Sequence, residues 1–160
     1  MLKLGKHSKE KYETLHSDLR RIIDRALIYS NVDFGISHGY RLPEEQFELF
    51  KQGRKKKYNK WTVIDKSKVI TQLDGYEKLS KHNQDPSEAF DFFAWVPGKK
   101  ELMYDKSNLV YLASMFLTIG ADLYNRGEIE YKVRSGLNWD MDGEIITDQN
   151  FIDMCHLELV

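Results

Sequence analysis

Two segments of this chain carry apolar residues at helical spacing, and short apolar runs of strand length lie between and after them. A capping Ser17-Asp18 pair precedes the first stripe, which predicts a helix over residues 18–30. The second stripe predicts a helix over residues 108–126, which Gly127 closes. Because helices and short strands interleave without a regular βαβ repeat, the sequence predicts the α+β class.

Turn and breaker residues mark the shorter elements. A helix is expected between Pro43 and Gly53, with Phe47 and Phe50 facing inward. The polar, lysine-rich stretch 54–75 predicts a loop with one irregular strand. Short strands are expected at residues 32–36, 89–96, 129–133 and 156–160, with a turn-rich connection at residues 136–148.

The length and composition predict a single domain over residues 1–160. Hydrophobic residues make up 41% and charged residues 31%, a balance that excludes a disordered or membrane-embedded chain. Cys155 is the only cysteine, which excludes an intrachain disulfide and a cysteine-rich zinc site. The net charge of −1 gives no overall attraction to nucleic acid, so no nucleic-acid partner is expected.

Basic residues nevertheless form a cluster, RKKK, at residues 54–57, followed by Tyr58 and Trp61. A phosphate or a cell-wall polyanion could bind there, or the cluster could be a solvated loop. Both interpretations stay open at this point.

The apolar segments bear on where the protein acts. Residues 1–6 lack the apolar segment of a secretory signal, and residues 109–121 are too short to span a bilayer. We therefore expect a chain made in the cytoplasm without a signal peptide and without stable membrane insertion.

Two of the five histidines lie in contexts that suggest metal binding. His82 precedes the apolar strand that contains Asp91, where a carboxylate is costly unless it is paired or bound to a cation. His156 lies in a second apolar strand, in which it faces the same side as Glu158. Two imidazoles and a carboxylate would give zinc three protein ligands and leave the fourth position to water. The alternative is that His82 is a loop residue and His156 a hydrogen-bonded core residue.

Cys155 adjoins His156, so a nucleophilic role must be considered. Neighbours in a strand point to opposite faces, which keeps the two side chains from forming a reactive pair. We interpret Cys155 as a buried, inert residue.

Four sequence blocks are distributed along most of the chain. They are SHGYRLPEEQ with LFKQGR at residues 37–54, VIT with SKHN and AFD at residues 69–91, RSGLNWD at residues 134–140, and DMCHLEL at residues 153–159. Their content and order resemble a zinc peptidase family that contains D-alanyl-D-alanine carboxypeptidases and phage L-alanyl-D-glutamate endopeptidases. Each block alone is weak, but the resemblance extends from Leu19 to Leu159.

The resemblance implies a fold, a metal and its ligands. The fold would be a small antiparallel sheet with packed helices, similar to that of Hedgehog and the D-Ala-D-Ala zinc peptidases. His82, Asp91 and His156 would be the zinc ligands. Asp153 would act as the general base, and Arg41 would stabilise the oxyanion that forms during hydrolysis.

The same resemblance assigns roles to other residues of the cleft. Ser80 and Trp139 would contact the substrate, and Glu158 would orient a metal ligand. Three histidines match no ligand position and are expected at the surface: His7, His16 and His38.

Two departures from the family pattern affect this assignment. The eight residues between His82 and Asp91 exceed the usual family spacing, so their loop must bulge, and Asp85 inside it is a rival ligand. We favour Asp91 because its sequence context matches and because a strand holds a ligand more rigidly than a loop does. Asn138 replaces an aspartate of the third block, which leaves the ligands untouched but changes the cleft.

The function implied by the resemblance is zinc-dependent hydrolysis of peptidoglycan stem peptides. A short chain without a signal is similar to the phage endolysins, which reach the cell wall after membrane permeabilisation during host lysis. We expect cleavage of the L-alanyl-D-glutamate bond by a monomer. A D-alanyl-D-alanine carboxypeptidase and a non-catalytic cell-wall-binding module remain as alternatives.

Overall fold

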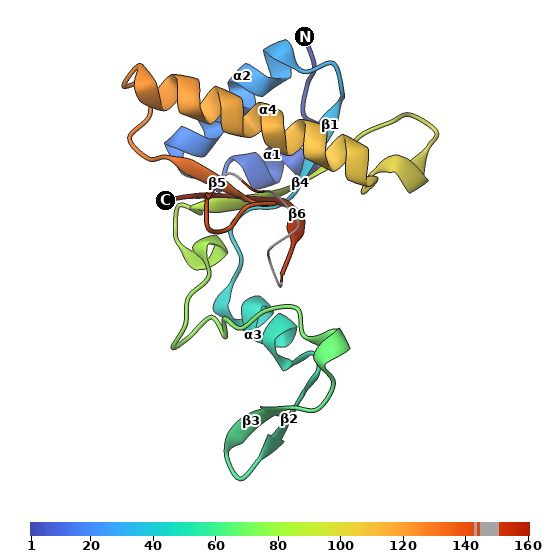
Figure 1. Ribbon diagram of the computed structural model, residues 1–160, viewed down its shortest axis with the longest axis vertical. Coiled ribbons are helices and arrows are strands. Elements are labelled where there is room, and N and C mark those ends of the chain that lie inside the picture. Colours follow the sequence, from blue (N-terminus) through green and yellow to red (C-terminus); the bar gives the residue numbers. More distant parts are fainter. Residues whose placement is uncertain (143, 145–150) are drawn as a thin grey trace.

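A four-stranded antiparallel sheet positions the candidate site (Figure 1). The structure is a computed structural model, and it describes residues 1–142, 144 and 151–160. The strands are β1 (Phe34–His38), β4 (Ala89–Ala94), β5 (Val133–Gly136) and β6 (Asp153–Leu159). Their spatial order is β1-β4-β6-β5, which puts β4 and β6 in the centre of the sheet.

Three helices cover one face of this sheet (Figure 1). They are α1 (Lys6–Tyr12), α2 (Ser17–Tyr29) and α4 (Lys106–Asn125). α4 packs across the sheet and against α2, while α1 packs beside β1. Phe116 of α4 meets Phe90 and Phe92 of β4 edge to face, with ring centroids 5.4 and 5.0 Å apart. The hydrophobic core therefore lies between the helices and this face of the sheet.

A smaller part of the chain lies on the opposite side of the sheet (Figure 1). It contains α3 (Pro43–Lys51) and a hairpin of β2 (Arg54–Lys57) and β3 (Lys60–Val63), which projects away from the sheet. Tyr58 and Asn59 form the hairpin turn, and both have a positive φ, 45° and 64°, as a tight two-residue turn requires. Short 3-10 turns occur at Lys66–Lys68, Lys81–Asn83 and Lys100–Leu102.

The predicted α+β class is confirmed by this arrangement. The helices predicted over residues 18–30 and 108–126 are α2 and α4, and the helix expected after Pro43 is α3. The ends differ from the expected ones by one or two residues because caps and periodicity fix an end only approximately. The strands expected at residues 32–36, 89–96 and 156–160 are β1, β4 and β6.

The prediction for residues 54–75 is wrong, because this stretch contains a regular hairpin. Trp61 of β3 packs against Phe47 and Phe50 of α3, with ring centroids 5.7 and 6.4 Å apart. The two phenylalanines therefore support the hairpin and not the main core, contrary to expectation. Gln46 is the buried residue of α3.

The strand expected at residues 129–133 begins only at Val133. The backbone N–H groups of Glu130 and Tyr131 donate instead to the carboxylate of Asp18, at 2.8 and 3.1 Å. A side chain at the start of α2 thus satisfies backbone groups that would otherwise pair in a sheet.

Two further expectations concern the remaining segments. No helix in the described part of the chain is long and apolar enough to cross a membrane. The turn-rich connection expected at residues 136–148 lies partly outside the described residues, and its first residue, Gly136, is the last residue of β5.

Deleting residues 157–160 should unfold the protein, because β6 is a central strand and its Leu157 and Leu159 are buried. Losing a buried leucine costs about 2–5 kcal/mol, and whole domains are stable by only about 5–15 kcal/mol. Thermal melting followed by far-ultraviolet circular dichroism measures the effect. A truncated chain that melts cooperatively near the full-length temperature would contradict the central role of β6.

Candidate metal centre

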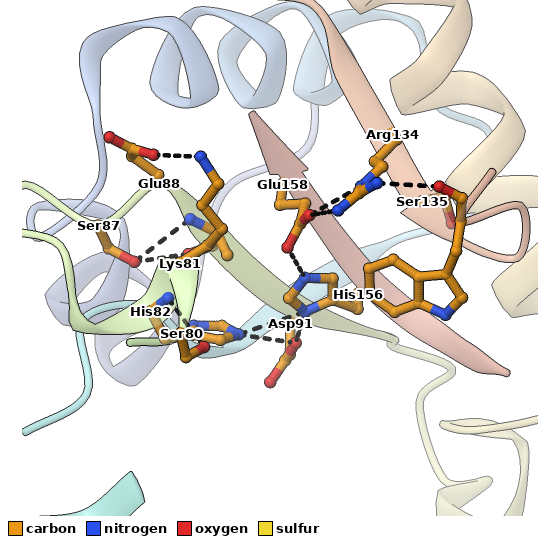
Figure 2. A network of polar contacts seen from close by, with 12 residues as sticks. Ser80, Lys81, His82, Ser87, Glu88, Asp91, Arg134, Ser135, His156 and Glu158 are labelled. Atoms are coloured by element: carbon orange, nitrogen blue, oxygen red, sulfur yellow. Dashed lines mark hydrogen bonds and ion pairs between the residues drawn. The ribbon is translucent and has the colours of Figure 1, made fainter. Parts of the chain in front are cut away.

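Three donor atoms from distant parts of the sequence converge on the face of the sheet opposite the helices (Figure 2). His82 Nε2 lies 3.2 Å from Asp91 Oδ1 and 3.3 Å from His156 Nδ1. Asp91 Oδ1 and His156 Nδ1 are 2.9 Å apart. Within the described part of the chain, this is the group of histidine and acidic side chains whose spacing could hold a metal ion. The fold therefore brings together the three residues predicted as ligands.

Strand pairing places two of these side chains next to each other. Asp91 of β4 is the cross-strand partner of His156 of β6, so both project from the same face of the sheet. The preceding residue, Phe90, is paired with Leu157, and both are buried in the core on the other face. One register thus fixes both the core contacts and the site.

The third donor residue, His82, comes from the 3-10 turn Lys81–Asn83. Ser80 caps this turn, since its Oγ accepts the backbone N–H of His82 at 3.3 Å. The segment around Arg41 is tied to the same turn: its N–H donates to the carbonyl of His82, and its carbonyl accepts from the Asn83 amide, both at 2.8 Å. Ser80, predicted to contact the substrate, is buried in its capping position and also borders the cleft.

Each histidine has a second partner that fixes the orientation of its ring. His82 Nδ1 lies 2.7 Å from the carbonyl oxygen of Gly39. Because a carbonyl only accepts, Nδ1 carries the hydrogen and Nε2 presents its lone pair to the site. His156 Nε2 lies 3.0 Å from Glu158 Oε2, which leaves Nδ1 facing the site. Glu158 is thus placed to orient the ring of His156, as the role implied by the family resemblance requires.

Glu158 is itself held by a residue that the sequence did not identify as part of the site (Figure 2). Arg134 of β5 is its cross-strand partner and donates to Glu158 Oε1 from Nη2 at 2.6 Å and from Nε at 2.8 Å. This two-pronged ion pair is charge-assisted and geometrically specific. Arg134 also donates to the carbonyl oxygen of Trp139 at 2.9 Å, which ties the following loop to the sheet.

The electrostatics of the cluster call for a cation. Burial would raise the pKa of Asp91, but hydrogen bonds with His156, His38 and His82 hold that pKa well below its usual range. Burial would lower the pKa of His156, yet its bonds to Asp91 and Glu158 raise the pKa to about 9. Two carboxylates thus favour positive charge between them. A metal ion can supply that charge in place of a proton, and two nitrogens with one carboxylate oxygen suit zinc.

The cluster opens into a cleft of about 1120 Å³ between the sheet and the α3 side of the molecule. The sheet wall carries the polar residues of the cluster, together with Arg41 and Asp153. The opposite wall is largely aliphatic and is formed by residues that include Leu49, Val63, Val69, Ile70 and Leu79. A substrate backbone can therefore lie against polar groups on one side and apolar groups on the other.

Asp153, the predicted base, stands at the start of β6 and borders the cleft. Its carboxylate Oδ1 accepts from the thiol of Cys155 at 3.2 Å. Gly136 lies directly opposite Asp153 across an irregularity in the β5–β6 pairing, and a Cβ there would overlap the carbonyl of Asp153. Only glycine allows this approach, which identifies Gly136 as a support for Asp153.

Cys155 is partly buried, whereas a fully buried residue was expected. Burial raises the pKa of its thiol, and the nearby carboxylates of Asp153 and Asp91 raise it further. Both effects disfavour the thiolate form, in agreement with the interpretation of Cys155 as unreactive.

Arg41 lies beside the cluster with its guanidinium fixed from two sides. Nη1 donates to Gln46 Oε1 at 2.9 Å, and Nη2 lies 3.5 Å from Asp91 Oδ2. The buried Gln46 is anchored in turn by the carbonyl of Leu73, to which its amide donates at 2.9 Å. These contacts explain why α3 buries a polar residue, Gln46.

Three candidate residues remain to be placed: Trp139, Asp85 and His38. The ring of Trp139 lies against that of His156, with centroids 5.2 Å apart, and borders the cleft as predicted. Asp85, the rival ligand, is exposed and lies outside the cluster. His38 is exposed, as expected, but its Nδ1 lies 3.4 Å from Asp91 Oδ2, so it belongs to the edge of the site. Its position as the cross-strand neighbour of Asp91 could be found only from the strand register.

An α+β domain in which an aspartate and a histidine of the sheet and a histidine of an adjoining turn face one cleft has the donor set of a metal-dependent hydrolase. The sequence matches the family described as Phage L-alanyl-D-glutamate peptidase over residues 1–160. The chain therefore belongs to this family of peptidoglycan peptidases, which confirms the interpretation of the four sequence blocks.

Solved structures share the fold. In the crystal structure of the L-Ala D-Glu endopeptidase ChiX of Serratia marcescens, the match has a TM-score of 0.62 at 19% sequence identity. It covers 99% of this chain and 90% of that one, so the likeness in fold extends over the whole domain. No curated protein matches this sequence.

Changing Asp91 to alanine should remove the metal-binding capacity, whereas Asp85→Ala should leave it intact. The first change deletes one of three converging donors, and the second alters an exposed side chain outside the cluster. Elemental analysis after zinc loading and dialysis gives the metal content per chain, with His82→Ala as a second loss-of-ligand variant. Retained zinc in Asp91→Ala together with lost zinc in Asp85→Ala would reverse the assignment.

Proposed function

We propose that this protein is a zinc-dependent endopeptidase that cleaves the L-alanyl-D-glutamate bond of peptidoglycan stem peptides. The proposal is carried by the convergence of His82, Asp91 and His156 in a cleft that Asp153 and Arg41 also border. Family membership supports the class of substrate and bond.

In this proposal zinc would be held by His82 Nε2, Asp91 and His156 Nδ1. The bound ion would polarise the scissile carbonyl and lower the pKa of a water molecule at its open position. Gly39 and Glu158 keep the two imidazoles in the tautomers that present their lone pairs to the ion.

Asp153 is the proposed general base. It takes a proton from the attacking water and passes it to the amine of the leaving D-glutamate. The thiol of Cys155 fixes one oxygen of this carboxylate, and Gly136 lets the strand bring its backbone close to β5. These contacts keep the base in one position relative to the cleft.

Arg41 is the proposed partner of the oxygen on which negative charge develops. Its guanidinium is held by Gln46 and lies beside Asp91, so little reorganisation is needed when the charge appears. A preorganised charge of this kind typically lowers the barrier by about 3–4 kcal/mol.

The proposed biological role is that of a phage endolysin acting in host lysis. Such an enzyme reaches the cell wall after the membrane has been permeabilised by another protein. We propose that the protein acts as a monomer.

Asp153→Asn should retain zinc and the fold but lose activity by about a hundredfold or more, because an amide cannot accept the proton. Turnover of a soluble muropeptide and zinc content are measured on the same preparation. Asp85→Asn serves as a matched control with the same chemical change at an exposed position outside the cleft. Near-normal turnover of Asp153→Asn would remove Asp153 from the mechanism.

Digestion of purified peptidoglycan tests the bond. Mass spectrometry and amino-group labelling should reveal L-alanine left on the muramyl residue and a new amine on D-glutamate. Release of free D-alanine without a new D-glutamate amine would identify a D-alanyl-D-alanine carboxypeptidase instead. Zinc binding without cleavage of any muropeptide would favour a cell-wall-binding module.

A further inference from the structure

A strongly basic segment projects from the same side of the molecule that forms the aliphatic wall of the cleft (Figure 1). We call residues 51–68 the basic arm; it comprises the end of α3, the β2–β3 hairpin and the following turn. The arm contains eight of the 24 basic residues of the chain and one of the 25 acidic ones. A charge of +7 on the arm is therefore set against −8 on the remainder.

The basic cluster at residues 54–57 is not uniform. Arg54 is buried at the base of the hairpin, where it donates to the carbonyl of Phe50 at 2.5 Å and to Gln72 at 2.6 Å. Its guanidinium also stacks 4.1 Å from the Phe50 ring centroid. Arg54 is thus a structural residue. The lysines that follow it are exposed on both faces of the hairpin.

The charges of these lysines are not balanced by acidic partners in the part of the chain that the structure describes. Lys55, Lys56, Lys57 and Lys60 form no ion pair with any residue in the described part of the chain. Lys57 and Lys60 are direct cross-strand partners, and like charges in this position are destabilising. The arrangement does not add to the stability of the hairpin, and it leaves four positive charges available to a partner of opposite charge.

The tip of the hairpin supports the same conclusion. Tyr58 is 100% exposed and adopts a left-handed φ of 45°, a conformation that favours glycine or asparagine over an aromatic residue. In the isolated chain this ring packs against nothing. Aromatic residues are enriched where proteins contact partners.

The arm is nevertheless held firmly at its base. The carbonyl of Gly53 accepts the backbone N–H groups of Ile64 and Asp65, at 2.9 and 3.1 Å, which closes the hairpin. Trp61 packs on the aromatic side chains of α3. Four residues per strand give a projection of about 13 Å, so the lysine charges extend outward from a fixed support.

We propose that the basic arm binds the carboxylates of stem peptides adjacent to the one in the cleft, and so holds the enzyme on intact peptidoglycan. Continuity supports this partner: Val63 at the end of β3 and Lys66 in the following turn both line the cleft. A polymeric substrate that enters the cleft therefore passes the base of the arm. Stem peptides carry free carboxylates, whose charge is complementary to the lysines.

A membrane surface fits the arm less well. Interfacial segments present an apolar face beside a basic one, whereas lysines occupy both faces of this hairpin. The partner is thus a hydrated polyanion. This inference rests on the proposed function for the identity of the polymer, but the binding measurements below do not require catalysis.

The test compares wild type with a variant in which Lys55, Lys56, Lys57 and Lys60 are all changed to glutamine. The control variant changes four exposed lysines distant from the arm in sequence, Lys9, Lys11, Lys99 and Lys100, and has the same net charge. Co-sedimentation with purified sacculi is measured at low and at physiological salt, and hydrolysis is measured on sacculi and on a soluble muropeptide. Melting temperatures verify that both variants are folded.

The arm variant should bind sacculi about tenfold more weakly at low salt, with a flatter salt dependence than the control variant. Hydrolysis of sacculi should fall in parallel, while turnover of the soluble muropeptide stays within about twofold of wild type. Binding and hydrolysis of sacculi equal to the control variant would overturn the proposal. If no preparation cleaves any muropeptide, the proposed function fails, and co-sedimentation still decides the role of the arm.

A second measurement uses the unaltered protein and identifies the charged group. Sacculi whose carboxylates have been converted to amides should bind wild type as weakly as untreated sacculi bind the arm variant. Undiminished binding to the amidated polymer would overturn the assignment to carboxylates. Arm-dependent binding to vesicles of anionic phospholipid that exceeds binding to sacculi would also overturn it, in favour of a membrane.

Discussion

The site depends on a carboxylate placed in the middle of an apolar sheet. Asp91 lies between Phe90 and Phe92, which fill the core on the other face of β4. A buried carboxylate without compensation would cost several kcal/mol. The two histidines provide that compensation, and they come from a turn and a strand distant in sequence. The electrostatic requirement of one side chain thus links three separate elements of the fold.

The sheet organises the surrounding residues in two rows that cross its strands. One row joins His38 of β1, Asp91 of β4 and His156 of β6. The other joins Glu158 of β6 to Arg134 of β5. Because side chains alternate along a strand, a shift of one residue would exchange these polar groups with the leucines and phenylalanines of the core. The burial of the opposite face therefore helps to keep the site in register.

The sequence predicts best the parts that depend on local pattern. α2 and α4 follow from helical stripes, and three converging donors follow from motif blocks that the family match supports. The supporting residues His38, Arg134 and Gly136 could not be assigned, because each acts through a cross-strand neighbour and strand register is not a local property. The hairpin was missed for a related reason. β2 consists of basic residues alone, and in β3 only Trp61 and Val63 alternate with polar residues, which is too short an apolar pattern to indicate a strand.

The two sides of the cleft are built differently. The residues proposed for catalysis lie on one side, and those proposed for binding the polymer lie on the other. The three donor residues, Asp153 and their supports lie on or against a hydrogen-bonded sheet, which limits their movement relative to one another. The opposite side consists of α3, the basic arm and aliphatic residues, held by a small aromatic cluster and by Arg54. Substitutions on the exposed lysines can therefore change how the protein holds a polymer without displacing a donor atom. An enzyme acting on an insoluble, charged substrate benefits from this arrangement, because retention on the polymer and bond cleavage can be adjusted independently.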